Sequence, residues 1–351
     1  MRQADPRMAS GPTDAPAINR RRGRVIASLL RLVPRLVPLK GWTIVTDRLH
    51  PYIVDGATDV VHRTREGLEL HLDLADYIQR GIFYEAWEAP ELAFARAILR
   101  PGDIMFDVGA NVGIFTLVGA RAVGPAGEVH AFEPIPVNFD RLTENVQRNG
   151  FANVVLNQAA AGPLDGVIQL GLEPDMERTS GKQMSGFFTV GSTQRQVTVP
   201  VVQLDRYAGA HLPDRAIRFI KVDVEGYEPE VLRGLQLLLG AQKVDILMME
   251  VDVYSLNRLG TTIGALVDRL VTPGYLLYRP TLPGRLGRWV YKGEPAIPRR
   301  TPGRHGLIST ILIGLQDLER NFNLVAIRGG HPALAGKPRS LPATSLGRTD
   351  G

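Results

Sequence analysis

Short apolar runs alternate with stretches of helical periodicity along the middle of the chain, beginning near residue 66. Apolar runs of four to eight residues are typical of buried strands, whereas apolar positions three and four residues apart indicate a helix that buries one face. We therefore predict helices over residues 90–100, 114–123, 136–148, 229–239 and 262–270. Strands are predicted over residues 104–108, 129–132, 154–156, 219–224, 244–251 and 275–278, with a last edge strand over 323–327.

Strands that alternate with helices predict an α/β fold with a mainly parallel sheet and helices on both faces, because right-handed crossovers place them there. In such a sheet, ligands bind beyond the carboxyl ends of the strands. Two segments interrupt the alternation. A polar stretch over residues 173–196 is expected to form a hairpin or excursion, and a Pro/Arg/Gly-rich insertion covers residues 280–304.

The first predicted strand and the helix after it are joined by the turn DVGANVG, which starts at Asp107. Gly109 lets the chain turn sharply and Gly113 lets the helix approach the sheet, while Ala110 and Asn111 present backbone to a ligand at the helix N-terminus. A turn of this kind also fits a dinucleotide-binding fold. Asp107 changes that balance, because an acid at the strand end repels a pyrophosphate but can hold an ammonium group.

Glu133, followed by Pro134, stands at the end of the second predicted strand. A carboxylate there can accept hydrogen bonds from both hydroxyls of a ribose. A second interpretation is that Glu133 caps the helix that opens at Pro136.

Lys221, Asp223 and Glu225 are spaced two apart at the end of the fourth predicted strand. Residues two apart on a strand point to one face, so these side chains are expected to form one row. Three ionisable groups on a central strand are costly to bury, which indicates function. A purely structural ion pair between Lys221 and Asp223 is the alternative.

Taken together, these motifs resemble the FkbM-type S-adenosyl-methionine-dependent methyltransferases. The resemblance covers about Gly81 to Ile327. It rests on residues 107–113, 132–134, 204–205 (Leu-Asp), 220–226 and Val231, Leu232 and Gly234, in that order. It implies a class I methyltransferase Rossmann-like fold: a seven-stranded, mainly parallel sheet with the last strand antiparallel and helices on both faces.

The resemblance also implies S-adenosyl-L-methionine as the cofactor. The implied cofactor-binding residues are Asp107, Gly109, Ala110, Asn111, Gly113, Glu133, Pro134, Gln158 and Ala159. Asn157 and Gln158 stand where many relatives of the wider fold place an acid near the adenine, so the chain departs from the pattern there. The segment Tyr84, Glu85, Trp87 and Glu88 resembles the part of the family that folds over the cofactor, with plain packing as the alternative.

Oxygen is the expected methyl acceptor. The chain lacks the Asn/Asp-Pro-Pro-Tyr sequence that would favour a base nitrogen, and without cysteine it cannot use the covalent C5-pyrimidine route. An alcohol is a poor nucleophile and needs a positioned base. We assign that role to Asp223, with Glu225 assisting and Lys221 orienting the hydroxyl. A divalent ion on Asp223, Glu225 and Glu250 is a second possibility, but the predicted site contains no metal.

The resemblance implies a small-molecule or glycan acceptor, namely a hydroxyl of a sugar, glycan or natural product. Methylation of RNA or protein, a non-catalytic module that keeps the cofactor fold, and a nicotinamide-dependent oxidoreductase are the competing interpretations. Intact acids at 107, 133 and 223 argue against the binding module. Asp107 and the absence of a third glycine argue against the oxidoreductase.

The composition narrows these choices further. With 351 residues and no cysteine, the chain can bury a large core but has no disulfide, thiolate metal site or cysteine nucleophile. The net charge of +5 is unevenly spread: residues 1–50 carry 10 Lys/Arg against 3 Asp/Glu and residues 280–351 carry 11 against 4, so the body is acidic. An acidic body argues against specific nucleic-acid binding.

The expected organisation has four parts. Residues 1–19 form a disordered lead, 20–80 a basic N-terminal helical and strand extension, 81–328 the methyltransferase domain, and 329–351 a disordered tail. No apolar stretch approaches the roughly 20 residues of a membrane-spanning helix, so a cytoplasmic protein is expected. The basic N-terminal segment leaves weak contact with a membrane surface open. The sequence does not predict the oligomeric state.

Overall fold

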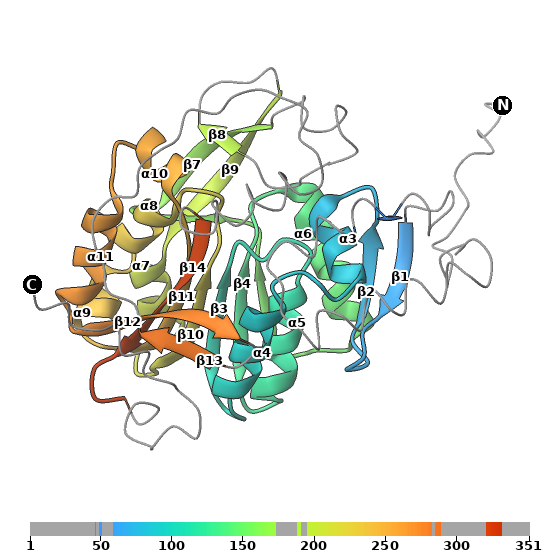
Figure 1. Cartoon of the computed structure of the whole chain (residues 1–351), viewed down its shortest axis with the longest axis horizontal. Coiled ribbons are helices and arrows are strands. Elements are labelled where there is room, and N and C mark those ends of the chain that lie inside the picture. The colour runs from blue at the N-terminus through green and yellow to red at the C-terminus, as the bar shows by residue number, and fades with distance from the viewer. Residues whose placement is uncertain are drawn as a thin grey trace, which may run out of the picture.

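A central eight-stranded sheet organises the molecule (Figure 1). The computed structural model describes residues 46, 49–50, 59–172, 188–190, 195–282, 285–288 and 321–331. The sheet order is β13-β12-β14-β11-β10-β3-β4-β5. Its strands are β3 (Ile104–Val108), β4 (Glu128–Phe132), β5 (Val154–Asn157), β10 (Ile217–Val222), β11 (Val244–Asp252), β12 (Tyr275–Leu282), β13 (Arg285–Arg288) and β14 (Asn321–Arg328).

The strand directions give the class I methyltransferase arrangement. Strands β5, β4, β3, β10 and β11 pair in parallel, and β14 pairs antiparallel with both β11 and β12. The predicted seven-stranded sheet with an antiparallel last strand is therefore confirmed. One detail was wrong: β14 is not an edge strand, because it inserts between β11 and β12. The eighth strand, β13, lies in the expected insertion and pairs with β12 as a hairpin.

Helices cover both faces of this sheet (Figure 1). Along β3, Met105 belongs to the apolar cluster on one face and Ile104, Phe106 and Val108 to the cluster on the other, as the period of two in a strand requires. One face is covered by α4 (Ala89–Ile98), α5 (Ile114–Val123) and α6 (Pro136–Arg148). The other is covered by α7 (Leu204–His211), α8 (Glu228–Arg233), α9 (Gln236–Gly240), α10 (Val253–Arg258) and α11 (Ile263–Val271).

The predicted helix over residues 229–239 is two short helices, α8 and α9. Asp205 explains the break, because its carboxylate accepts hydrogen bonds from the backbone N–H groups of Leu237 and Leu238 at the start of α9. Groups at a helix start need such partners, so Asp205 caps a new helix from a distant part of the chain.

An N-terminal hairpin packs on the body of the domain. It consists of β1 (Asp59–Arg63) and β2 (Glu69–Asp73) and is followed by α3 (Tyr77–Phe83). Its apolar side chains share one cluster with α5 and α6. The expected domain boundary at residue 81 falls inside α3, so the hairpin and the sheet belong to one folded body.

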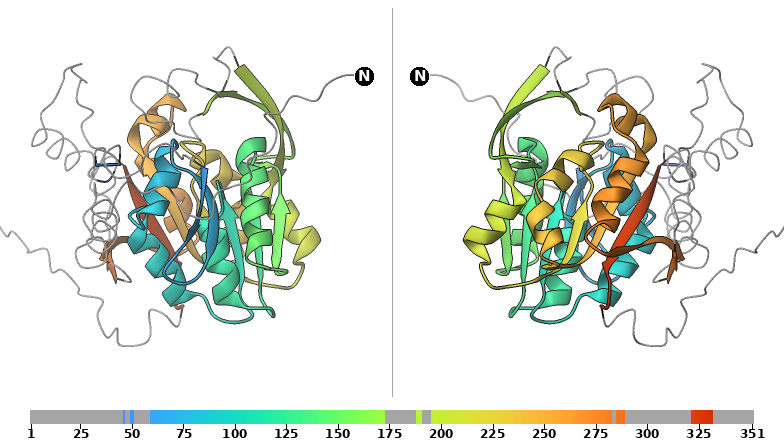
Figure 2. Two further views of the ribbon diagram at one scale, coloured as in Figure 1. Left: turned by 90° about the vertical axis from the view of Figure 1, so that its right-hand side faces the viewer. Right: turned by 90° about the vertical axis from the view of Figure 1, so that its left-hand side faces the viewer.

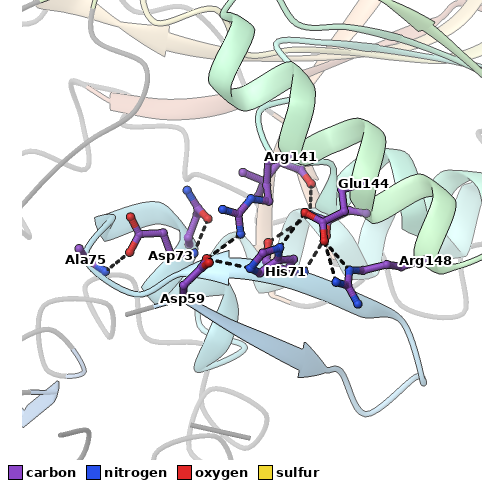
Figure 3. A network of polar contacts seen from close by, with 10 residues as sticks. Asp59, His71, Asp73, Ala75, Arg141, Glu144 and Arg148 are labelled. Carbon is purple, nitrogen blue, oxygen red and sulfur yellow. Dashed lines mark hydrogen bonds and ion pairs between the residues drawn. The ribbon is translucent and has the colours of Figure 1, made fainter. Parts of the chain in front are cut away.

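His71 anchors this hairpin to α6 (Figure 3). Its Nε2 lies 2.8 Å from Asp59 Oδ1 and its Nδ1 lies 2.7 Å from Glu144 Oε2. The backbone N–H of His71 donates to the buried side chain of Asn145, whose Nδ2 donates to the carbonyl oxygen of Val112. Asn145 thus joins the hairpin directly to the loop that follows β3.

A second, four-stranded sheet rises above the central one (Figures 1 and 2). Its order is β6-β9-β7-β8, from β6 (Ala160–Gly162), β7 (Gly166–Leu172), β8 (Phe188–Val190) and β9 (Arg195–Gln203). Most of the expected excursion over 173–196 lies outside the described residues. The same holds for residues 1–19 and 332–351 and for most of 280–304. Within the described part of the chain, no helix combines the length and apolar character needed to cross a membrane.

Candidate functional site

A cavity of about 210 Å³ lies where the chain leaves the carboxyl ends of β3, β4 and β10. This is the position at which sheets of this type bind ligands. The cavity brings together nine of the twelve residues predicted for the site, although they come from four separate stretches of chain. These nine are Gly109, Ala110, Asn111, Glu133, Pro134, Ala159, Lys221, Asp223 and Glu225.

Three predicted residues do not line the cavity. Gln158 has an exposed side chain outside the lining. Gly113 lies one step behind it, next to Leu142 of α6. Asp107 is fully buried, and its Oδ2 accepts a hydrogen bond of 2.6 Å from the Thr116 hydroxyl. These three residues therefore lie outside the cavity that the other nine residues line.

The ammonium group that lies close to Asp107 is that of Lys221. Burial raises the pKa of Asp107, and the Lys221 charge and the Thr116 hydrogen bond work against that rise. Asp107 therefore lies behind the cavity wall, where its charge stabilises that of Lys221.

Gly109 allows the turn after β3 to touch the end of β10. Its φ is +83°, a value that favours glycine, and its N–H donates to the carbonyl oxygen of Phe132. The N–H of Ala110 donates to the same oxygen. These two hydrogen bonds hold the turn against β4, and residues 109–111 line the cavity.

Glu133 sits at the end of β4 with its carboxylate buried. It accepts hydrogen bonds from the N–H groups of Asn111 and Ile135, at 2.9 and 3.0 Å. Burial raises its pKa to about 7, although both backbone hydrogen bonds oppose the rise. The bond to Ile135 shows that Glu133 also supports the start of α6, so the capping interpretation applies alongside any contact with a ligand.

The side chains at the end of β10 do not form the single row on one strand face that the sequence predicts. The strand stops at Val222, and Glu225 adopts a φ of +53° in a turn, so strand alternation does not reach it. Lys221, Asp223 and Glu225 still line the cavity together. Lys221 Nζ lies 3.0 Å from Asp223 Oδ2, so the ion pair weighed as an alternative is present at the cavity wall.

Lys221 is a firmly held cation. Burial lowers its pKa, but the charges of Asp223, Asp107 and Glu88 outweigh that effect and raise the pKa above the usual range. Its Nζ also lies 4.8 Å from the ring centroid of Phe115. The lysine therefore keeps its charge at all physiological pH values.

Sequence reasoning missed Glu228. Its buried carboxylate accepts hydrogen bonds from the N–H groups of Val224 and Gly226, and burial raises its pKa to about 7. It folds back over the turn that carries Glu225 and fixes its shape. The available signal was a carboxylate two residues after a glycine turn, a spacing from which a side chain can reach the turn's backbone.

Carboxylates gather around this end of the cavity. Burial, reinforced by the charge of Asp223, raises the pKa of Glu225 and of Glu250 well above the usual range. Crowded carboxyl groups that share so little positive charge hold their protons more tightly than isolated ones. In the described part of the chain, no three His, Cys, Asp or Glu side chains are arranged to hold a metal ion.

The two halves of the segment over residues 84–88, directly before α4, have different surroundings. Trp87 and Glu88 line the cavity, as a covering segment would. Tyr84 is buried and packs edge-on against Phe83, and Glu85 Oε1 accepts a hydrogen bond from the backbone of Arg65 away from the cavity. The covering interpretation thus fits the second half of the segment and the packing interpretation fits the first.

Comparison with known proteins supports the class that the fold defines, that of the class I methyltransferases. The model of the Methyltransferase FkbM domain matches residues 107–277. The chain is 34% identical over 162 residues to the 31-O-demethyl-FK506 methyltransferase FkbM of Streptomyces tacrolimicus, covering 39% of this chain and 61% of that relative. It is 27% identical over 175 residues to the hexuronic acid methyltransferase AglP of Haloferax volcanii, covering 48% and 66%.

Residues 107–277 therefore form an FkbM-type methyltransferase domain, and the resemblance seen in the sequence is confirmed. The chain spans about three fifths of the length of the first curated relatives that it matches. Among solved structures, an O-methyltransferase of Thermotoga maritima covers 78% of this chain at 14% identity and a TM-score of 0.34. The fold assignment rests on the strand order of this chain.

Proposed function

We propose that this protein is an S-adenosyl-methionine-dependent O-methyltransferase. The observation that carries the proposal is the position of the Lys221–Asp223 ion pair, which shares one cavity with the glycine turn and with Glu133. A base, a backbone cradle and a buried carboxylate acceptor are the parts that methyl transfer to a hydroxyl needs.

The residues present fit the cofactor. A Cβ on Gly109 would lie 1.8 Å from a backbone oxygen, so the turn is open only because no side chain stands there. Glu133, with its raised pKa, supplies an acceptor for ribose hydroxyls, and residues 109–111 line the cavity beside it. When bound, the cofactor supplies a methyl group on a positively charged sulfur, an electrophile that needs only an aligned nucleophile.

Asp223 is the proposed general base. Lys221 Nζ lies 3.0 Å from Asp223 Oδ2 and so holds this carboxylate at the cavity wall. This carboxylate would accept the proton of the acceptor hydroxyl during methyl transfer. Lys221 orients the pair and stabilises negative charge on the acceptor oxygen, and Glu225 assists from the adjoining turn.

For the acceptor, we propose a hydroxyl of a sugar, glycan or natural product. Two relatives support this class, since they are named for a demethylated FK506 and for a hexuronic acid. Methylation of RNA or protein is not favoured, because carboxylates rather than basic residues surround the cavity.

Two measurements test the proposal. Calorimetry is expected to show binding of S-adenosyl-homocysteine and none of a nicotinamide dinucleotide. A screen with cofactor labelled in its methyl group is expected to place label on an acceptor hydroxyl, in a manner insensitive to salt. Label transfer to RNA that falls steeply with salt would contradict the assigned acceptor class.

A further inference from the structure

Glu88 reaches the cavity from outside the matched domain. It lies directly before α4, whereas the family model begins at residue 107. Its side chain makes no capping hydrogen bond to α4 but lines the cavity instead. Its Oε2 is buried and has no hydrogen-bond partner in the described part of the chain.

Glu88 belongs to the part of the cavity formed by the end of β10 together with α4 and β14. The groups that act on it are Asp223 and Lys221 at the end of β10, Glu91 of α4 and Asn323 of β14. The turn after β3, Glu133 after β4 and Ala159 after β5 form the other half. If those three hold the cofactor, as proposed above, Glu88 faces the acceptor.

Carboxyl groups outnumber basic groups in the acceptor half of the cavity. Glu88, Asp223 and Glu225 line it, and Glu228 and Glu250 lie close enough to influence their titration. Among the described lining residues, Lys221 is the single Lys, Arg or His, and Asp223 already pairs with it. An anionic group on an acceptor would meet several carboxyl groups and a Lys221 that is already paired with Asp223, whereas a donor group would find carboxyl oxygens.

The buried Glu88 Oε2 has no hydrogen-bond donor in the described part of the chain, which indicates that a ligand supplies one. Unpaired buried oxygens are unfavourable, and native proteins normally satisfy them. Burial and the charge of Asp223 raise the pKa of Glu88 to about 8, so in the empty cavity this carboxyl carries a proton much of the time. A ligand that donates a hydrogen bond would take the place of that proton.

We propose that Glu88 is a specificity-determining residue for a non-anionic acceptor: its carboxylate accepts a hydrogen bond from a hydroxyl or ammonium group beside the methylated hydroxyl, and the neighbouring carboxylates exclude acceptors with an anion there. This rests on the proposed function. The shared chemistry is a hydrogen-bond donor; whether that donor is a hydroxyl or an ammonium is decided by the test.

The test uses three glycosides with the same ring: methyl glucoside, its 2-amino analogue and methyl glucuronide. Each is titrated into the full-length protein loaded with S-adenosyl-homocysteine, and the dissociation constants are compared. The neutral and amino glycosides are expected to bind at least tenfold more tightly than the glucuronide. Tighter binding of the amino glycoside identifies an ammonium as the donor, and equal binding identifies a hydroxyl.

Glu88→Gln removes the charge and keeps the shape. It is expected to weaken binding of the preferred glycoside about tenfold and to narrow the gap to the glucuronide, with affinity for S-adenosyl-homocysteine unchanged. Glu88→Asp, which withdraws the carboxylate by one methylene, is expected to give an intermediate loss. The matched control is Glu85→Gln, in the same segment and also with positive φ, whose carboxylate lies outside the cavity.

Several results would overturn the inference while the proposed function stands. These are glucuronide binding as tight as that of the glucoside, unchanged selectivity in Glu88→Gln, and failure of all three glycosides to bind. Loss of S-adenosyl-homocysteine affinity in Glu88→Gln would also overturn it, by showing that Glu88 serves the cofactor. If the wild-type protein does not bind S-adenosyl-homocysteine, the proposed function itself is wrong.

Discussion

Gly109 and the carbonyl oxygen of Asp223 lie so close that a Cβ on the glycine would be 1.8 Å from that oxygen. The turn that cradles the proposed cofactor therefore packs directly on the backbone of the proposed base. Asp223 completes the contact from the other side, since its N–H donates to the carbonyl oxygen of Val108. Main-chain contacts therefore fix the glycine turn and Asp223 relative to each other, and side-chain motion cannot loosen them.

Gly109→Ala is expected to damage both the fold and the site. The positive φ of +83° and the clash with Asp223 together cost about 2 kcal/mol or more. We expect a lower melting temperature and loss of measurable S-adenosyl-homocysteine binding in calorimetry. Gly102→Ala is the control, because Gly102 has a φ of +89° but open space around it, and it should lose only about 1 kcal/mol with normal cofactor affinity.

Asp223→Asn is expected to lower turnover by about 10²- to 10⁴-fold, the usual loss when a general base is removed. Because the carboxylate acts only as the proton leaves, affinity for S-adenosyl-homocysteine should change little. Glu225→Gln should be milder, and a chelator should leave the wild-type rate unchanged. Near-normal turnover in Asp223→Asn, or activity that a chelator abolishes and magnesium restores, would contradict the general-base assignment and favour a metal ion in its place.

Glu133 makes cofactor binding sensitive to pH. Its pKa of about 7 in the free protein means that a proton must leave before both oxygens can accept ribose hydroxyls. Affinity for S-adenosyl-homocysteine should therefore fall as pH drops below 7, by up to about tenfold per pH unit. Glu133→Gln should bind more weakly by about 1–3 kcal/mol and lose this dependence, whereas Glu230→Gln, on the surface beside Arg233, should keep it.

Glu228 makes stability of the ligand-free protein depend on pH in the opposite direction to most carboxylates. Its pKa is raised from 4.5 to about 7 in the fold, so its contribution is fully present below pH 4.5 and is lost as pH rises through 7. The contribution of Glu228 to the melting temperature should therefore fall between about pH 4.5 and pH 7 and stay constant above that. Glu228→Gln keeps an acceptor oxygen for the N–H groups of Val224 and Gly226, so it should melt higher than the wild type at pH 9. Identical pH profiles for the two proteins would contradict this role.

Elements with a strong local pattern could be predicted from the sequence alone. The predicted bounds of β3 and α5 match the structure, because both are short apolar segments ended by glycine. The break between α8 and α9 could not be predicted, since it depends on Asp205, some 30 residues away. The insertion of β14 between β11 and β12 is likewise a matter of tertiary pairing.

The site shows the same division. The turn at 109–111 could be identified from the sequence because the residues that line the cavity there are contiguous along the chain. Glu88 was noticed only as part of a covering segment, since its importance comes from Asp223 and Lys221 beside it. Gln158 is the reverse case: it was predicted from its position in a motif, and its side chain is exposed and outside the cavity lining.

The place of β14 also governs the order in which this domain can assemble during synthesis. β11 and β12 do not pair with each other, and each is joined to the sheet's antiparallel strand, which is the last of the sheet to leave the ribosome. Until residues 321–328 emerge, β12 has no partner that links it to the rest of the sheet, and the edge of β11 stays open. A nascent chain arrested before residue 321 would therefore present an unpaired strand edge to chaperones and to other chains.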